Sequence, residues 1–96
     1  MSKIHSESPD RLFEAILSLK SAEECFDFFE DHCTIKELKD LSLRLEGASM
    51  LREGRSYQEV TKETGVSAAT ICRVNKCLMY GEGYKKVLVR LDGDNK

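Results

Sequence analysis

The residues best suited to chemistry lie between positions 67 and 76, where small side chains accompany two cations. On a helix of 3.6 residues per turn their spacing places six side chains on one face. They are Ser67, Ala68, Ala69, Cys72, Arg73 and Lys76. Small side chains let a helix approach base edges, a guanidinium can bond guanine or phosphate, and an ammonium can pair with phosphate. This face is therefore typical of a helix that enters the major groove of DNA.

Two short helices over residues 56 to 78 are predicted to present this face. Ser56 followed by Glu59 is a capping box, so a first helix should begin directly after Ser56. Gly65 readily takes the left-handed conformation that ends a helix, and Ser67 then caps a second helix. The pattern predicts a helix-turn-helix motif.

Apolar residues at helical spacing indicate how the two helices pack. Val60, Val66, Ile71 and Val74 are expected to face the partner helix or the body of the domain. The same spacing also occurs in an ordinary helical hairpin without nucleic acid, so DNA binding at this stage is a hypothesis.

The rest of the chain is predicted to be helical, which gives an all-α fold. Capping boxes at Ser21 with Glu24 and at Thr34 with Glu37 mark two helix starts, and Gly54 marks the end of the longest helix. Besides the motif, helices are expected over 10–20, 22–32, 35–53 and 84–91. In the last of these, Val87, Leu88 and Leu91 should face inward.

Length and apolar content point to one domain that pairs with a second copy. The 96 residues allow only a modest core, and several short amphipathic helices leave more apolar surface than one chain can bury. We therefore predict an interlocked homodimer. Within the single domain 1–96 we expect an N-terminal dimerisation arm with its helices over 1–33, a long central helix over 34–54, the helix-turn-helix over 56–79 and a closing helix over 84–91.

Charge is distributed unevenly along the chain. It has 15 basic and 17 acidic residues and a net charge of −2, which is not typical of an indiscriminate nucleic-acid binder. Residues 1–33 carry a net charge of −5, whereas residues 34–96 carry +3. The C-terminal part is thus the better candidate to face phosphate, and the acidic part can serve for subunit pairing or as a solvated surface.

Several classes of protein are not expected. No run approaches the roughly 20 apolar residues of a membrane span, and no signal peptide is evident, so we expect a cytoplasmic protein that does not enter membranes. Cys25, Cys33, Cys72 and Cys77 lack metal-ligand spacing, so no metal site is predicted, and Cys25 is expected in the core. Neither of the two histidines, His5 and His32, has a nucleophile at suitable spacing, so no catalytic residue is predicted.

Residues 29 to 91 resemble the Trp repressor family, and more closely its YerC/YecD-type relatives, which are small bacterial DNA-binding proteins. The matching stretches are 44–46 and 50–54 on the long helix, 56–60 on the first helix of the motif, and 69–73 on the second. The resemblance implies an intertwined dimer whose paired motifs contact two successive major grooves of a palindromic operator in double-stranded DNA. Gln58 on the first helix joins the candidate DNA contacts.

The resemblance also implies a site for an amino-acid corepressor beside the second helix. Thr34, Arg44, Thr70 and Arg73 match positions that line this site, with one arginine stacking on the ring and the other binding the carboxylate. Alternatively, Arg44 pairs with Asp40 one turn earlier on its helix, and Arg73 touches only DNA phosphate.

Four positions depart from the family's pocket pattern. Asp31 and Cys33 stand where leucines are expected, Val74 where a glycine is expected, and Cys77 where a serine is expected. These exchanges imply a smaller and more polar cavity than one built for tryptophan. Relatives of this branch are linked to the control of histidine biosynthesis, so the corepressor, if there is one, is histidine or tryptophan, and no other cofactor is expected.

The function predicted from the sequence is a sequence-specific DNA-binding regulator that represses amino-acid biosynthesis genes. The alternative is a helical protein-interaction dimer, an adaptor, in which the acidic N-terminal part binds a partner and the paired helices serve as scaffold.

Overall fold

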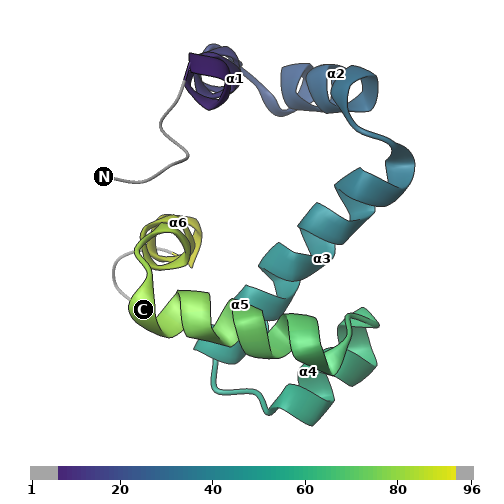
Figure 1. The fold of residues 1–96 in the computed structure, drawn as a ribbon, viewed down its shortest axis with the longest axis vertical. Helices are drawn as coiled ribbons and strands as arrows, with labels where there is room; N and C mark the ends of the chain where they lie inside the picture. The colour runs from purple at the N-terminus through teal and green to yellow at the C-terminus, as the bar shows by residue number, and fades with distance from the viewer. Residues whose placement is uncertain (1–6, 93–96) are drawn as a thin grey trace. The chain divides into compact units, whose positions relative to one another are not determined.

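The computed structural model describes residues 7–92, and over this range the chain forms six helices and no strand (Figure 1). They are α1 (Glu7–Leu17), α2 (Ala22–His32), α3 (Ile35–Arg52), α4 (Tyr57–Thr64), α5 (Ala68–Tyr80) and α6 (Gly83–Asp92). The all-helical prediction is confirmed. The first part of the predicted dimerisation arm and His5 lie outside the described residues.

The chain divides into two compact units, residues 1–38 and 39–96. The boundary falls inside α3, so the first turn of that helix belongs to the first unit. The described parts of the two units, 7–38 and 39–92, differ in how much they bury.

In the first unit, local hydrogen bonds set the helix ends. Ser18 donates its hydroxyl to the Ala15 carbonyl at 2.6 Å, and its amide bonds the carbonyls three and four residues back. These tight turns end α1 at Leu17, three residues before the predicted end. The hydroxyl of Ser21 accepts from the Glu24 amide at 3.1 Å and begins α2 where predicted.

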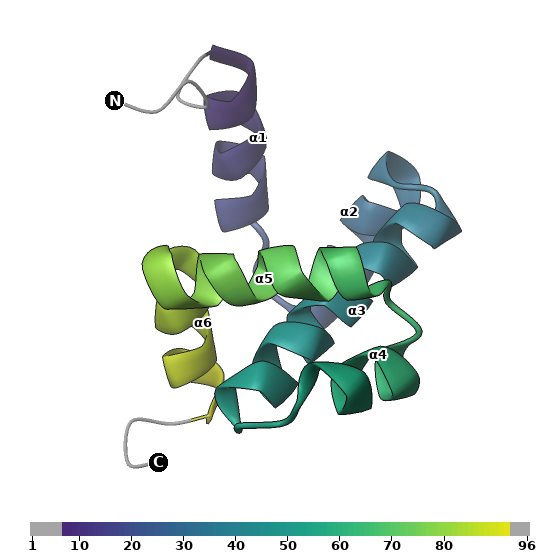
Figure 2. The same cartoon turned by 60° about the horizontal axis from the view of Figure 1, so that its bottom comes forward.

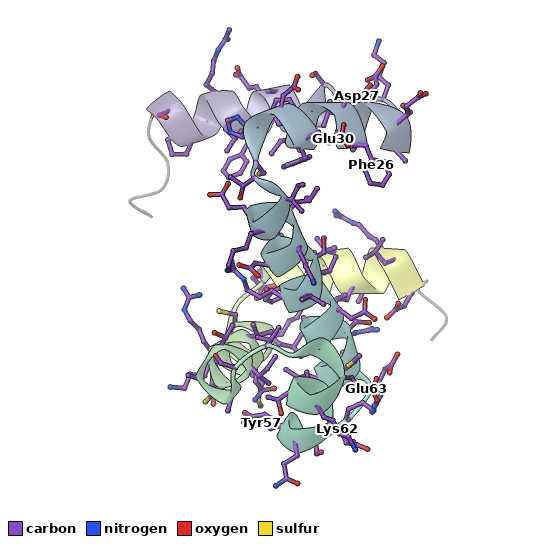
Figure 3. The ribbon with its side chains drawn as sticks, turned by 90° about the vertical axis from the view of Figure 1, so that its right-hand side faces the viewer. Phe26, Asp27, Glu30, Tyr57, Lys62 and Glu63 are labelled. Atoms are coloured by element: carbon purple, nitrogen blue, oxygen red, sulfur yellow. The ribbon has the colours of Figure 1, made fainter. Side chains whose placement is uncertain are left out.

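The helix α2 carries aromatic and acidic side chains but buries none of its residues (Figure 3). The rings of Phe28 and Phe29 meet edge to face with centroids 5.2 Å apart, and His32 stacks on Phe28 at 5.3 Å. Phe26 is 64% exposed. The expectation that Cys25 is a core residue is wrong for the single chain, because no other element covers its apolar stripe and the thiol is exposed.

The second unit has a defined core between three helices. Ala48 of α3, Val74 and Leu78 of α5, and Leu88 of α6 form its centre, with Leu51 and Tyr84 packed against it. Figure 2 shows α5 crossing α3, with α6 beside the end of α5. Burying the valine and the two leucines contributes roughly 1.5–3 kcal/mol each.

A glycine on α3 brings the helix-turn-helix close to the core. A Cβ atom at Gly47 would lie 3.0 Å from Cδ1 of Ile71 and 3.4 Å from Cγ1 of Val60. Both of these side chains are fully buried. The absence of a side chain at position 47 therefore lets α3, α4 and α5 meet at one point.

The closing helix α6 extends one residue beyond its predicted range at each end. Only one of its three predicted inward residues is buried: Leu88 is 1% exposed, whereas Val87 and Leu91 are 43% and 65% exposed. The reason is that α6 packs against α5 and α3 along a single narrow stripe. At its end, Asp92 accepts a hydrogen bond from Arg52 of α3 at 2.7 Å.

The apolar side chains along α3 are covered only at its C-terminal end. Ala48 is buried, whereas Ile35, Leu41 and Leu45 remain exposed in the single chain.

Within residues 7–92, no helix is both long and apolar enough to cross a membrane.

Candidate nucleic-acid interface and ligand pocket

The first helix of the motif, α4, begins with the predicted capping box. Ser56 accepts the Glu59 amide on its hydroxyl at 3.2 Å, and the Glu59 carboxylate accepts the Ser56 amide at 3.0 Å. The helix ends at Gly65, whose φ of 76° lies in the left-handed region that glycine adopts without steric cost. Both local predictions are confirmed.

The turn of the motif is held by Thr64, for which no role was predicted from the sequence. The Thr64 hydroxyl donates to the Val60 carbonyl at 2.7 Å and accepts the Val66 amide at 3.1 Å. Thr64 is buried, so these bonds satisfy its polar atom and fix the direction in which the chain leaves α4. A threonine just before the glycine of a turn is the signal that could have revealed it.

The second helix, α5, presents the predicted face. Its N-cap is Ser67, which accepts the Thr70 amide at 3.2 Å. Five of the six residues of this face are exposed, and Cys72 is half-buried. The exposed ones are Ser67, Ala68, Ala69, Arg73 and Lys76. On the opposite side, Ile71 and Val74 are buried. Neither cation of this face forms an ion pair with another residue of the described range.

One hydrogen bond between side chains joins the two helices of the motif. Asn75 of α5 donates to the Tyr57 hydroxyl of α4 at 2.8 Å. Tyr57 stands at the start of α4, and Figure 3 shows it at one end of that helix. Gln58, the candidate contact next to it, is exposed. The pairing spans 18 residues, so helical spacing within either helix could not reveal it.

A cluster of charges covers the outer side of α4. Arg55 forms ion pairs with Glu63 and, at 3.5 Å, with Glu59. Hydrogen bonding and attraction to Glu63 raise the pKa of Arg55. The pKa of Glu59 is lowered, chiefly by the hydrogen bond from the Ser56 backbone amide and further by the positive charge of Arg55. The cluster therefore reinforces the cap of α4.

A pocket of about 310 Å³ lies between α3 and the start of α5. It is lined by Asp40, Arg44, Val66, Ser67, Thr70 and Arg73. Three of the four predicted ligand residues, Arg44, Thr70 and Arg73, thus meet at one site. Thr34 lies in the first unit, where it caps α3: its hydroxyl accepts the Glu37 amide at 3.0 Å.

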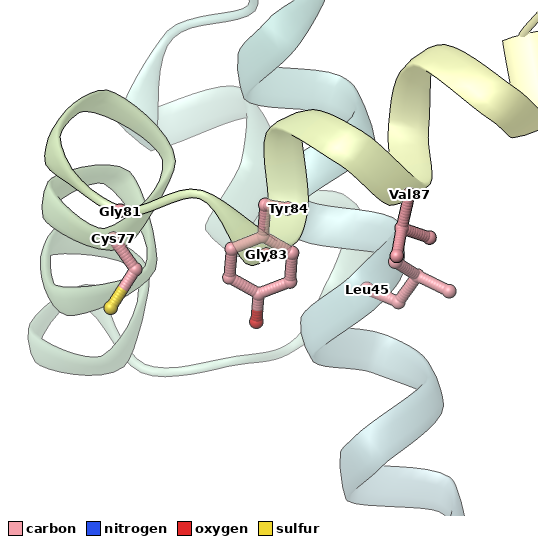
Figure 4. A pocket seen from close by; sticks show the side chains of 6 residues that line it. All are labelled: Leu45, Cys77, Gly81, Gly83, Tyr84 and Val87. Atoms are coloured by element: carbon pink, nitrogen blue, oxygen red, sulfur yellow. The ribbon is translucent and has the colours of Figure 1, made fainter. Parts of the chain in front are cut away.

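Two of the four positions that depart from the family's pocket pattern, Val74 and Cys77, do not line this pocket. Val74 belongs to the core with Ala48 and Leu78, because its side chain points to the buried side of α5. Cys77 lines a second hollow of about 400 Å³. Figure 4 shows this apolar hollow, with Cys77 on α5, Tyr84 and Val87 on α6, and Leu45 on α3. In the described chain Val74 and Cys77 therefore do not narrow the pocket that Arg44 and Arg73 line.

Fold, motif and exposed face together define a helix-turn-helix protein of the DNA-binding type. Residues 7–92 match the family model described as Trp repressor protein, and the chain belongs to the Trp repressor family. The predicted family is confirmed.

Three relatives match this chain in sequence or structure over nearly its whole length. YerC of Bacillus subtilis (strain 168), an uncharacterized protein, is 51% identical over 90 residues, which are 93% of this chain and 86% of YerC. A crystal structure of a TrpR-like protein from Eubacterium eligens is 52% identical with a TM-score of 0.87, covering 94% of both chains. A Staphylococcus aureus structure, provisionally described as a Trp repressor, is 40% identical with a TM-score of 0.88 and covers 96% of both chains.

Family membership establishes the coarse function. The chain is a DNA-binding regulator of a dimeric, all-helical family, and this family consists of regulators rather than enzymes.

Proposed function

We propose that this protein is a sequence-specific repressor of amino-acid biosynthesis genes that binds a palindromic operator as an intertwined homodimer. The observation that carries the proposal is the exposed face of α5, the recognition helix, with Arg73 and Lys76 pairing with no described residue. Because no ion-pair partner among the described residues has to be displaced, both cations are available to bind phosphate or bases.

Each part of the face has a role in this proposal. Ala68 and Ala69 allow close approach to the base pairs, and Cys72 provides a small contact beside them. Arg73 bonds a guanine edge or a phosphate, and Lys76 pairs with phosphate alone. Ser67 and Gln58 bind the backbone at the two helix starts. The hydrogen bond between Asn75 and Tyr57 keeps both helices in register for these contacts.

We further propose that the pocket between α3 and α5 binds a small amino acid, histidine or tryptophan, as corepressor. Arg44 and Arg73 offer two guanidiniums, and Thr70 offers a hydroxyl, on opposite walls of the pocket. Thr34 does not line this pocket, so its role as a ligand residue is supported only by the resemblance to the family. A ligand held under the recognition helix favours DNA binding to the extent that it binds the DNA-competent state more tightly.

The experiment is selection of bound DNA from a random library, with and without each amino acid, followed by gel-shift titration at several salt concentrations. We expect a palindromic consensus, salt-sensitive binding, and tighter binding with one of the two amino acids. Sequence-independent binding would contradict the specific regulator. If no DNA is retained at near-physiological salt, the adaptor function takes its place.

A further inference from the structure

The side-chain hydrogen bond between the two helices of the motif has a defined direction. The amide nitrogen of Asn75 lies 2.8 Å from the hydroxyl oxygen of Tyr57 and 3.6 Å from Sδ of Met79, one turn later on α5. A thioether sulfur can only accept a hydrogen bond, so the nitrogen of this amide, and not its oxygen, faces both neighbours. Asn75 therefore donates, and the Tyr57 hydroxyl accepts.

The Tyr57 hydroxyl keeps its own hydrogen for another partner. A phenol carries one O–H donor, and the NH₂ group that Asn75 presents to it cannot accept that hydrogen. No acceptor for it lies among residues 7–92. Tyr57 is 42% exposed, so an acceptor that approaches the motif from outside can reach the hydroxyl.

The hydroxyl of Tyr57 lies beside the face predicted for DNA contact. Asn75 follows Ala68 by seven residues and Cys72 by three, so these three residues share one side of α5. Ala68 and Cys72 belong to the predicted face, and Asn75 is the residue that holds the Tyr57 hydroxyl. Lys76, the proposed phosphate contact, is next to Asn75 in the sequence. Tyr57 of α4 thus brings a hydrogen-bond donor to the edge of the face on α5.

We infer that Tyr57 donates a hydrogen bond to a phosphate oxygen of the DNA backbone, and that Asn75 is the positioning residue that keeps the hydroxyl hydrogen available for this contact. Phosphate oxygens accept hydrogen bonds, and tyrosine hydroxyls are among the groups that bind them. Such a contact fixes the register of the protein on the duplex without adding a charge. The inference rests on the proposed function and extends it, because neither residue is among the predicted DNA contacts.

A purely structural role of the pair is the alternative. If the bond served only to hold α4 and α5 together, its direction would not matter. Donation to phosphate, in contrast, requires Asn75 to be the donor. An aspartate has the same shape as asparagine, but its carboxylate accepts the hydroxyl hydrogen of Tyr57 and so reverses the bond. The two roles therefore predict different results for Asn75→Asp.

The test is fluorescence anisotropy of the full chain with two duplexes of equal length, the operator selected from the random library and a mixed-sequence duplex at low salt. Tyr57→Phe removes only the hydroxyl and should weaken binding to both duplexes about 10-fold for each motif engaged. Because the lost donor is neutral, the slope of log affinity against log salt should stay the same. Tyr80→Phe makes the same exchange at an 82% exposed tyrosine at the end of α5 and should leave the affinity unchanged.

Asn75→Asp tests the positioning role. In the otherwise unchanged chain it should weaken binding through two effects, the added negative charge and the reversed hydrogen bond. On the Tyr57→Phe background only the charge remains, so the loss should be about 10-fold smaller for each motif. Thermal unfolding of all variants checks that they fold.

The outcomes separate this inference from the proposed function. If Tyr57→Phe binds both duplexes like the wild type, the phosphate contact is overturned and the proposed regulator stands. If its loss comes with a lower salt slope, the hydroxyl acts by placing Lys76, which overturns direct donation. Equal losses from Asn75→Asp on both backgrounds overturn the positioning role. If the wild type binds neither duplex, the proposed function fails together with this inference.

Discussion

The two units of the chain differ in what they bury. Every buried residue of the described range lies between Gly47 and Leu88, in the second unit. Both units expose apolar side chains, but those of the first unit, among them Phe13, Leu17 and Phe26, surround no buried residue in the described range. The second unit has its own core and positions both the recognition helix and the pocket. The first unit is acidic and leaves an apolar surface uncovered, which is what a segment that pairs with a second copy of the chain requires. We therefore expect assembly to depend on the first unit and recognition on the second.

The largest expected effect concerns the core of the second unit. Ile71→Ala removes a fully buried side chain at the meeting point of α3, α4 and α5, so the free energy of unfolding should fall by about 2–5 kcal/mol. Chemical unfolding followed by circular dichroism measures it. Leu17→Ala, in the exposed part of the first unit, should cost much less when the protein is monomeric, and equal losses would remove the contrast between the units.

The next effect concerns assembly. Phe26→Ala shortens an exposed aromatic side chain of the first unit, and we expect the dimer to dissociate at least about 10-fold more readily if this surface is the interface. Sedimentation velocity over a range of concentrations measures the dissociation constant. A constant identical to that of the wild type would place the interface elsewhere.

Recognition should depend on the second unit alone. Arg73→Ala is expected to weaken binding to the selected operator by about 1–3 kcal/mol, because it removes a bidentate contact. Arg11→Ala removes an arginine from the first unit and should leave the affinity unchanged. Fluorescence anisotropy without added amino acid keeps the pocket out of the comparison, and similar losses in both variants would contradict the assignment.

A smaller and different effect is expected at Lys76. Its replacement by alanine should weaken binding to all sequences evenly and reduce the slope of log affinity against log salt by about 1. Titrations at four or more salt concentrations give the slope. An unchanged slope would mean that Lys76 does not contact phosphate.

The smallest effect concerns pH and the cap of α4. Because folding lowers the pKa of Glu59, its ionised form stabilises the fold above the ordinary value of 4.5, and this contribution is lost as the pH falls below 4.5 through the lowered pKa. Glu59→Gln should therefore show a weaker loss of stability in acid than the wild type. Thermal unfolding from pH 7 to pH 3 compares them, and parallel curves would contradict this linkage.

Local signals accounted for most of the fold. The capping boxes at Ser56 and Thr34 and the left-handed Gly65 each involve residues close in sequence, so helix starts and the turn could be predicted from spacing. The apolar pattern could not distinguish side chains buried within the chain from apolar side chains that the single chain leaves exposed. For this reason Val87 and Leu91 were predicted to face inward but are exposed.

The candidate site was only partly predictable. The resemblance brought Arg44, Thr70 and Arg73 together correctly as neighbours, although it does not test what they bind. Asp40 was considered only as a partner within its helix, because its place in the pocket depends on how α3 and α5 cross. The bond between Asn75 and Tyr57 depends on the same crossing.

The missing side chain at Gly47 has a mechanical consequence. A Cβ atom at position 47 would lie only 3.0 Å from Cδ1 of Ile71, so the helix that carries Arg44 and the helix that carries Arg73 are in close contact there. We expect a side chain introduced at position 47 to push these two helices apart and so to change the spacing of the two arginines that line the cavity.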